Sequence, residues 1–157
     1  MRWFSRLIAP LVFIIAYTMF RSSVQKKSRK KHDLVMKLFR FAADNGHQKA
    51  LSVYGHLLHF RGDGPENRIQ GGIYLQQAAE KGDYKAQYQM GRIYEEGFEH
   101  YFQIDQFKAL SYYTRAAEHG HQLAIKRLVD IFSEGELGQS VSREEAQKWQ
   151  NKLPAIH

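Results

Sequence analysis

Residues 78–86 read Ala-Ala-Glu-Lys-Gly-Asp-Tyr-Lys-Ala, and two other stretches of the chain repeat this pattern. Residues 116–124, 38 positions later, read Ala-Ala-Glu-His-Gly-His-Gln-Leu-Ala, and residues 42–50, 36 positions earlier, read Ala-Ala-Asp-Asn-Gly-His-Gln-Lys-Ala. Self-similarity at this interval predicts an array of helical hairpins, each of which buries its apolar face only by stacking on its neighbours.

Each copy predicts two helices joined by a tight turn. The first helix carries the alanine pair, whose small side chains let a neighbouring helix approach closely. Gly82 and Gly120 stand where this helix must stop in a left-handed conformation, and Asp83 is predicted to cap the second helix. A fourth, incomplete copy begins at Ser142 and predicts a C-terminal capping helix that stops near Pro154.

This pattern resembles the Sel1-like repeat, a relative of the tetratricopeptide repeat, over roughly residues 33–153. The resemblance implies an all-α fold, namely a right-handed α-solenoid of about three helical-hairpin repeats plus a C-terminal capping helix. It also implies a protein-binding role and brings no catalytic residue and no cofactor with it. The residues that form the repeat signature are Ala78, Ala79, Gly82, Ala86, Gly91, Tyr94 and Gly97, then Ala116, Ala117, Gly120 and Ala124 in the next copy.

Length and composition limit the number of domains and exclude some classes of protein. The chain has 157 residues and a mass of 18.4 kDa, which allows one domain with a modest core. It contains no cysteine, which excludes a disulfide framework and a cysteine nucleophile.

The net charge of +7 is confined to the N-terminal segment. Residues 1–31 hold eight basic residues and no acidic one, whereas residues 32–157 hold the remaining 15 basic residues and all 16 acidic ones. A domain that binds nucleic acid needs a basic stripe on its folded surface, and this body has a net charge of −1. We therefore expect no nucleic-acid partner.

The N-terminal segment has the composition of a membrane anchor. Residues 7–20 are uncharged, and a helix from Trp3 to Phe20 is about 27 Å long, close to the ~30 Å hydrocarbon core. A cleaved signal peptide is disfavoured, because bulky or charged residues occupy the cleavage positions, and a buried core helix is the third interpretation. The expected organisation is an anchor with a basic juxtamembrane stretch (1–31), which includes a hydrophobic N-terminal helix (3–20), and a repeat domain (32–157).

The charges that flank the hydrophobic segment predict its orientation. Six Lys or Arg residues lie between positions 21 and 31, and fewer basic groups lie on the N-terminal side. The positive-inside rule then places the repeat domain in the cytoplasm of a single-pass bacterial inner-membrane protein. A periplasmic repeat domain is the alternative.

Two sets of residues are candidates for partner binding. The loop 97–103 is rich in aromatic residues where a polar loop is expected, and such clusters are candidate hot spots; in an equally open interpretation, Phe98 and Phe102 tuck under the next helix. The second set consists of first-helix positions that face away from the core. The candidates are Phe98, Tyr101 and Phe102 in the loop, and Arg40, Gln76, Gln77, Thr114 and Arg115 on the helices.

The search for catalytic and metal-binding patterns gives a negative expectation. His56 and His59 share a helix face, but a zinc site needs a third and fourth ligand, which the sequence does not supply. His47 and His121 are assigned to turns. The adjacent carboxylates of Glu95 and its neighbour point to different helix faces and cannot act as an acid/base pair. We expect no enzyme, no metal and no cofactor.

Together these patterns predict a membrane-tethered protein–protein interaction scaffold. An immunity protein that neutralises an antibacterial effector is one alternative, and a cell-envelope enzyme or small-ligand binder is another. A deep pocket with converging polar groups would favour the latter.

Overall fold

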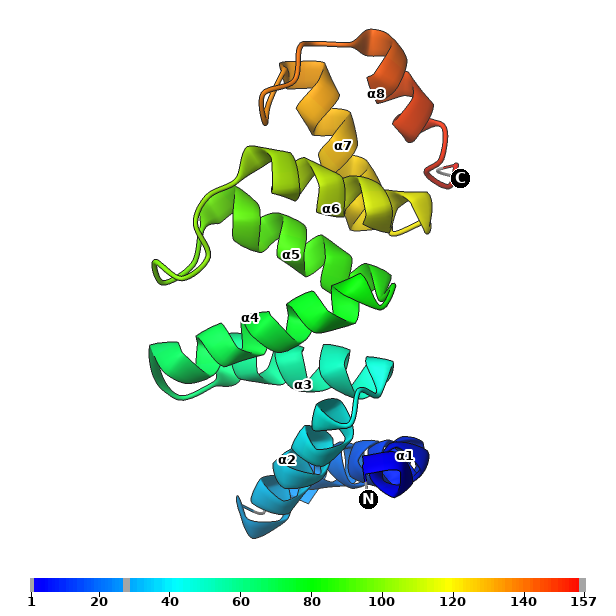
Figure 1. Cartoon of the computed structure of the whole chain (residues 1–157). Coiled ribbons are helices and arrows are strands. Elements are labelled where there is room, and N and C mark those ends of the chain that lie inside the picture. Colours follow the sequence, from blue (N-terminus) through cyan, green and yellow to red (C-terminus); the bar gives the residue numbers. More distant parts are fainter. Residues whose placement is uncertain (1, 27–28, 156–157) are drawn as a thin grey trace. The chain divides into compact units, whose positions relative to one another are not determined.

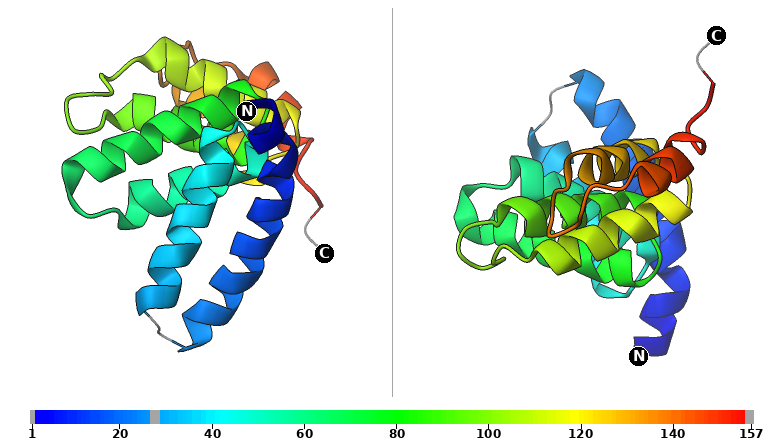
Figure 2. Two further views of the ribbon diagram at one scale, coloured as in Figure 1. Left: turned by 60° about the horizontal axis from the view of Figure 1, so that its bottom comes forward. Right: turned by 90° about the horizontal axis from the view of Figure 1, so that it is seen from above.

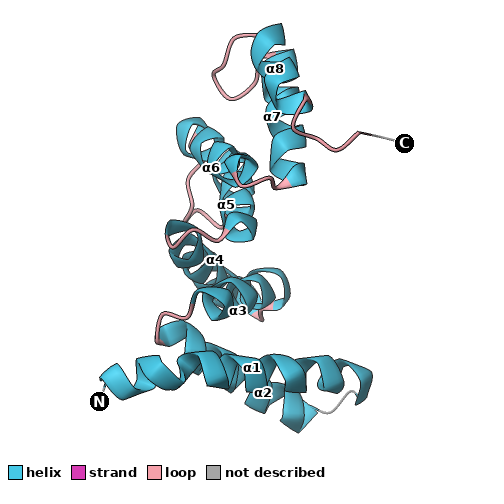
Figure 3. Ribbon diagram, turned by 90° about the vertical axis from the view of Figure 1, so that its right-hand side faces the viewer, coloured by secondary structure: helices cyan, strands magenta, loops and turns pink. Residues whose placement is uncertain are grey.

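The computed structural model describes residues 2–26 and 29–155, with the side chains of residues 23–26 outside the description. Lys27 of the predicted basic stretch therefore lies outside the described residues, as does the Lys26 side chain. The described residues form eight helices (Figures 1 and 3): α1 (Arg2–Lys26), α2 (Arg29–Asp44), α3 (Gln48–Arg61), α4 (Gly64–Glu80), α5 (Tyr84–Glu96), α6 (Gln106–Glu118), α7 (Gln122–Glu134) and α8 (Arg143–Gln150). Two compact units divide them, with α1–α4 in the first (Met1–Lys81) and α5–α8 in the second (Gly82–His157).

The three predicted turns have the geometry that their glycines permit. Gly46, Gly82 and Gly120 have φ values of 81°, 102° and 84°, in the region that residues with a Cβ rarely adopt. After α6, the amides of Gly120 and His121 donate to the carbonyl oxygens of the alanine pair, at 2.9 and 3.1 Å. The same two bonds follow α2. The repeated Ala-Ala-x-x-Gly pattern therefore encodes a helix end and its hydrogen bonds together.

The residue after each turn glycine caps the next helix. Asp83 accepts a hydrogen bond from the Ala86 amide at 2.8 Å, as predicted. His47 and His121 do the same with Nδ1, which accepts from the Ala50 amide at 3.2 Å and from the Ala124 amide at 3.3 Å. Only a neutral imidazole presents a free ring nitrogen as an acceptor. These two helix starts are therefore sensitive to histidine protonation.

We expect the stability of the protein to fall as the pH drops below 6.5, the ordinary histidine pKa. Burial lowers the pKa of both capping histidines, and the nearby Lys49 and Lys85 lower it further. The folded protein then binds these protons less readily than the unfolded chain, so acidification favours unfolding. Each cap should contribute about 1 kcal/mol above pH 6.5 and lose it as the pH falls through the lowered pKa.

Urea titrations at several pH values test this dependence. Replacing both histidines, as His47→Asp with His121→Asp, supplies a cap that stays an acceptor and should remove the part of the pH dependence that the caps cause. The contribution of His59, whose pKa is also lowered by burial, should remain. His32→Gln, at an exposed position of α2, is the control. An unchanged pH dependence in the double variant would show that the caps do not cause it.

In the first unit, α1 and α2 lie side by side and antiparallel (Figure 2, left). Ala9, Phe13 and Ala16 of α1 are buried. The Phe13 ring lies 5.9 Å from the ring of Phe39 in α2, a residue with 0% exposure. The hydrophobic N-terminal helix is therefore part of the core of this unit, and it covers the face that α2 would otherwise expose.

The helices α3 and α4 cross at two glycines. A Cβ built on Gly71 would lie 2.8 Å from the Gly55 carbonyl oxygen and closer still to the His59 amide nitrogen. A Cβ on Gly55 would lie 2.9 Å from the Leu75 amide nitrogen. The two backbones are therefore in direct contact, which requires glycine on both helices.

At the equivalent glycine of the second unit, the neighbouring group is an aromatic ring and not the backbone of another helix. A Cβ on Gly91 would lie 2.6 Å from the buried ring of Tyr113. The loops between repeats are anchored alike, because the amides of Asp105 and Ser142 donate to the carbonyl oxygens of Tyr94 and Phe132, each at 2.8 Å. In α8, the last helix of the described residues, Ala146 and Trp149 are buried, as expected of a capping helix.

Candidate interaction surfaces

The aromatic loop of the second unit is ordered by its own backbone. The Phe98 amide donates to the Phe102 carbonyl oxygen at 2.9 Å, and the Phe102 amide donates to the Phe98 carbonyl oxygen at 3.0 Å. Glu99 and His100 between them adopt positive φ values of 48° and 60°. This closed turn, together with the Asp105 amide bond to α5, holds the loop in one conformation.

The side chains of this loop divide into buried and exposed ones. Phe102 is 3% exposed and packs edge-to-face on Tyr94 with ring centres 5.9 Å apart, and Phe98 is half-buried. Tyr101 is exposed, and so are Ile104 at the end of the loop and Phe107 in the first turn of α6, which is 82% exposed. We call Tyr101, Ile104 and Phe107 the loop patch. The sequence did not single out Ile104 and Phe107, although both are large apolar residues beside a helix start.

The polar residues predicted to bind a partner, on the first helix of each repeat, differ in exposure and in their contacts. Arg40 is exposed and pairs with Asp44 at 3.6 Å, and Gln77 is exposed beside the half-buried Gln76. In the second unit, the Thr114 hydroxyl donates to the Leu110 carbonyl oxygen at 2.8 Å. The Arg115 guanidinium lies over the Tyr112 ring, 5.3 Å from its centre. Three of these side chains, those of Arg40, Thr114 and Arg115, therefore make contacts within their own helix.

A half-buried charge cluster joins α5 to α7 in the second unit. Arg127 forms hydrogen bonds to both oxygens of Glu95 and also bonds Glu136 at 2.5 Å, while the Tyr113 hydroxyl donates to Glu95 at 2.5 Å. Burial raises the pKa of Glu95, but the hydrogen bonds from Arg127 and Tyr113 outweigh it and hold the pKa below its usual value. Glu95 is thus an ionised structural group and does not have the raised pKa of a general acid.

The outer face of α1 is apolar and exposed. Most of it lies on the side of the helix opposite Ala9, Phe13 and Ala16, and Tyr17, whose ring lies 5.9 Å from that of Phe13, is at its edge. Within the described residues, α1 is the one helix long and apolar enough to cross a membrane, over Arg2–Ser22 with a mean hydropathy of 1.6. We call this surface the α1 apolar face; its members are Trp3, Phe4, Leu7, Leu11, Ile14, Ile15 and Tyr17.

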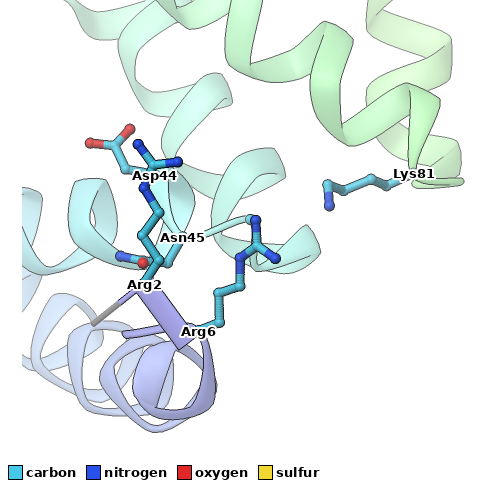
Figure 4. Close-up of a pocket in the computed structure, with 6 residues that line it drawn as sticks. Arg2, Arg6, Asp44, Asn45 and Lys81 are labelled. Atoms are coloured by element: carbon cyan, nitrogen blue, oxygen red, sulfur yellow. The ribbon is translucent and has the colours of Figure 1, made fainter. Parts of the chain in front are cut away.

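A basic hollow lies beside the N-terminal end of α1 (Figure 4). It has a volume of ≈ 670 Å³ and is lined by Arg2, Arg6, Asp44, Asn45, Gly46 and Lys81. Asp44 is already engaged, because it accepts a hydrogen bond from the Tyr74 hydroxyl at 2.6 Å and pairs with Arg40. Three cations and one carboxylate leave the lining positively charged, so the hollow adds to the basic character of this end of the helix.

The described residues contain no group of three or more His, Cys, Asp or Glu side chains placed to hold a metal ion. His56 and His59 each direct Nδ1 to a backbone carbonyl oxygen, of Ser52 at 2.8 Å and of Arg68 at 3.2 Å. Both histidines thus bond the backbone of their own unit.

Comparison with known proteins identifies the repeats. A family model of the Sel1 repeat matches residues 48–83, which contain α3 and α4, and residues 85–121, which contain α6 and nearly all of α5. The chain contains two Sel1 repeats. Sel1-like repeat proteins are generally protein-interaction modules, and their fold is typically a non-catalytic scaffold.

Solved structures place this Sel1-like repeat protein among all-α repeat folds, which confirms the predicted fold class. A Sel1 repeat protein from Oxalobacter formigenes matches with a TM-score of 0.73 and 25% identity, over 91% of this chain and 56% of that one. A protective antigen of uropathogenic Escherichia coli with an SLR fold matches with a TM-score of 0.73 and 22% identity, over 92% and 30%. An immunity protein from Pseudomonas aeruginosa matches with a TM-score of 0.55 and 22% identity, over 73% and 42%.

This Sel1-like chain therefore spans little more than half the length of the Oxalobacter protein and less than half of the other two. No curated protein sequence matches it.

Proposed function

We propose that this Sel1-like repeat protein binds another protein through the loop patch while α1 holds it at a membrane. The observation that carries the binding proposal is the contrast within one ordered loop. Phe102 is buried and fixes the loop, whereas Tyr101 and Phe107 present large aromatic surfaces to solvent. A rigid loop with exposed aromatic side chains loses little conformational entropy when it binds, which favours hot-spot behaviour.

We expect Tyr101 and Phe107 to contact the partner directly. A photo-crosslinking phenylalanine analogue at either position should capture a discrete protein in cells. The same analogue at Tyr84 should not, because Tyr84 is exposed but begins α5, at the opposite end of the α5–α6 hairpin. Alanine at Tyr101 or Phe107 should then weaken binding of the purified partner about tenfold or more.

The stability of these variants separates binding from folding. Both side chains are exposed, so their alanine variants should unfold at the same denaturant concentration as the parent. Phe102→Ala should instead destabilise the second unit, because it removes a buried ring. Equal capture from Tyr84, Tyr101 and Phe107, or unchanged affinity in both alanine variants, would contradict the proposal for the loop patch.

The membrane part of the proposal rests on composition and exposure. The helix α1 is long and apolar enough for a membrane segment, and its outer face is uncovered within the first unit. The basic residues at the end of α1 and the start of α2 favour the cytoplasmic leaflet and a cytoplasmic repeat domain, with the periplasm as the alternative. A single-pass span is the arrangement that the sequence predicts, and it requires α1 to separate from α2.

The immunity alternative is also a protein-binding function and differs in the identity of the partner. A captured partner that is itself a toxic effector, inhibited by this chain, would favour it over a scaffold. The likeness to the Pseudomonas immunity protein concerns the fold.

A further inference from the structure

The two faces of α1 differ in what covers them. One face is buried through Ala9, Phe13 and Ala16, and the opposite face carries five large exposed apolar or aromatic side chains between Phe4 and Ile15, with the exposed rings of Trp3 and Tyr17 at its edge. The Thr18 hydroxyl donates to the Ile14 carbonyl oxygen at 2.9 Å, so its donor is satisfied within the helix. All seven side chains of the α1 apolar face are uncharged. This surface is therefore suited to an apolar environment.

The charges of α2 limit how α1 can meet a membrane. Seven of the 16 residues of α2 are Lys, Arg or Asp, and α2 lies antiparallel along α1 (Figure 2, left). If α1 crossed the bilayer in this arrangement, these side chains would enter the hydrocarbon, where charged groups are strongly disfavoured. If α1 crossed alone, Val35 and Phe39, both with 0% exposure, would lose cover from α1.

An orientation parallel to the membrane surface avoids both costs. The α1 apolar face then enters the boundary between headgroups and acyl chains, and α2 stays on the side of the water. Trp3 and Tyr17 near the two ends of this face are residues enriched at that boundary. The packing of the first unit is retained unchanged.

The charge of the segment favours anionic lipid over a second copy of the chain. Residues 1–31 carry eight basic residues and no acidic one, and the hollow beside Arg2 and Arg6 is also positively charged. Pairing two α1 apolar faces would bring two such segments together and set like charges against each other. An anionic lipid surface instead supplies the opposite charge together with an apolar layer.

We propose that α1 lies in the plane of an anionic membrane surface, with the α1 apolar face in the lipid and α2 facing water. This proposal deepens the membrane attachment proposed above and rests on it. The first unit then binds lipid without unfolding its α1–α2 hairpin.

Vesicle binding by the full chain tests the role of the α1 apolar face. In a Trp149→Phe background, Trp3 is the remaining tryptophan and should shift to shorter emission wavelengths with anionic vesicles, less so with neutral vesicles or at high salt. Leu11→Glu should weaken vesicle binding about tenfold or more, because it puts a charge into the lipid-facing surface. Leu123→Glu in α7 is the matched control and should bind like the parent, since the two leucines are 59% and 54% exposed.

Labelling distinguishes the in-plane helix from a span. The chain has no cysteine, so Ser5→Cys and Ser22→Cys place single thiols near the two ends of α1. In bacterial cells, an impermeant maleimide should label both thiols in inverted membrane vesicles and neither in spheroplasts. Labelling of the two thiols from opposite sides would overturn the in-plane orientation and leave the membrane attachment standing. A full chain that binds neither vesicles nor cell membranes would overturn both.

Discussion

Replacing Gly71 by alanine should destabilise the first unit by roughly 1–3 kcal/mol, the range found for overpacked cores. At an open helix position this change would instead stabilise the protein by about 0.5–1 kcal/mol, because alanine has the higher helix propensity. The added Cβ would lie against the backbone of α3 at Gly55 and His59, which cannot rotate away as a side chain could. The sign of the effect is therefore diagnostic of the crossing.

Gln70→Ala provides the matched control, because Gln70 precedes Gly71 in α4 and is exposed. It should be neutral or slightly stabilising. Urea unfolding followed by circular dichroism gives the free energies, and hydrogen exchange of α3 and α4 locates the change. A stabilised Gly71→Ala variant would show that the two helices do not approach as closely as described.

Replacing Arg127 by methionine should destabilise the second unit by about 2–3 kcal/mol. The change leaves Glu95 and Glu136 facing each other without their shared cation, and the Glu95 side chain is only 22% exposed. Water therefore compensates the lost interactions only in part. Trp149 is buried in this unit, so its fluorescence reports the transition.

Arg92→Met is the control for Arg127→Met, because Arg92 pairs with Glu96 on the same helix at 3.7 Å and the two side chains are 47% and 66% exposed. Arg92→Met should lower the free energy of unfolding by less than about 0.5 kcal/mol. Adding Glu95→Gln to Arg127→Met should recover part of the loss, since it removes the unpaired charge. Equal effects of the two arginine changes, or no recovery, would mean that the cluster is not a coupled network.

The repeat fold could be predicted because short local stretches of sequence determine each helical hairpin. The alanine pair, the turn glycine and the following cap act within about ten residues, and the pattern occurs three times. The fold class, the helix order and the terminal capping helix were all confirmed. The capping by His47 and His121 was missed although their place in the turn was assigned, because histidine is an uncommon cap. Their alignment with Asp83 was the available signal.

Contacts between residues far apart in the sequence were harder to predict. Gly71 lies in α4 outside the repeated stretch, and its requirement arises only where α3 crosses it. Arg127 and Glu95 are 32 residues apart, and nothing in either local pattern pairs them. The hydrophobicity of α1 predicted a membrane segment, but hydropathy does not show that one face of this helix also completes a core. The partner-binding assignments to the loop and to the helix positions stay predictions.

The two ends of the series of helices are unequal. The last described helix, α8, buries Ala146 and Trp149 and exposes polar residues on its other side, the pattern of a capping helix. The first helix, α1, shows an apolar surface instead. Removing α1 to obtain a more soluble protein would therefore replace one exposed apolar surface by another, that of α2. Soluble preparations call for detergent or lipid with α1 kept, or for a polar helix built in its place.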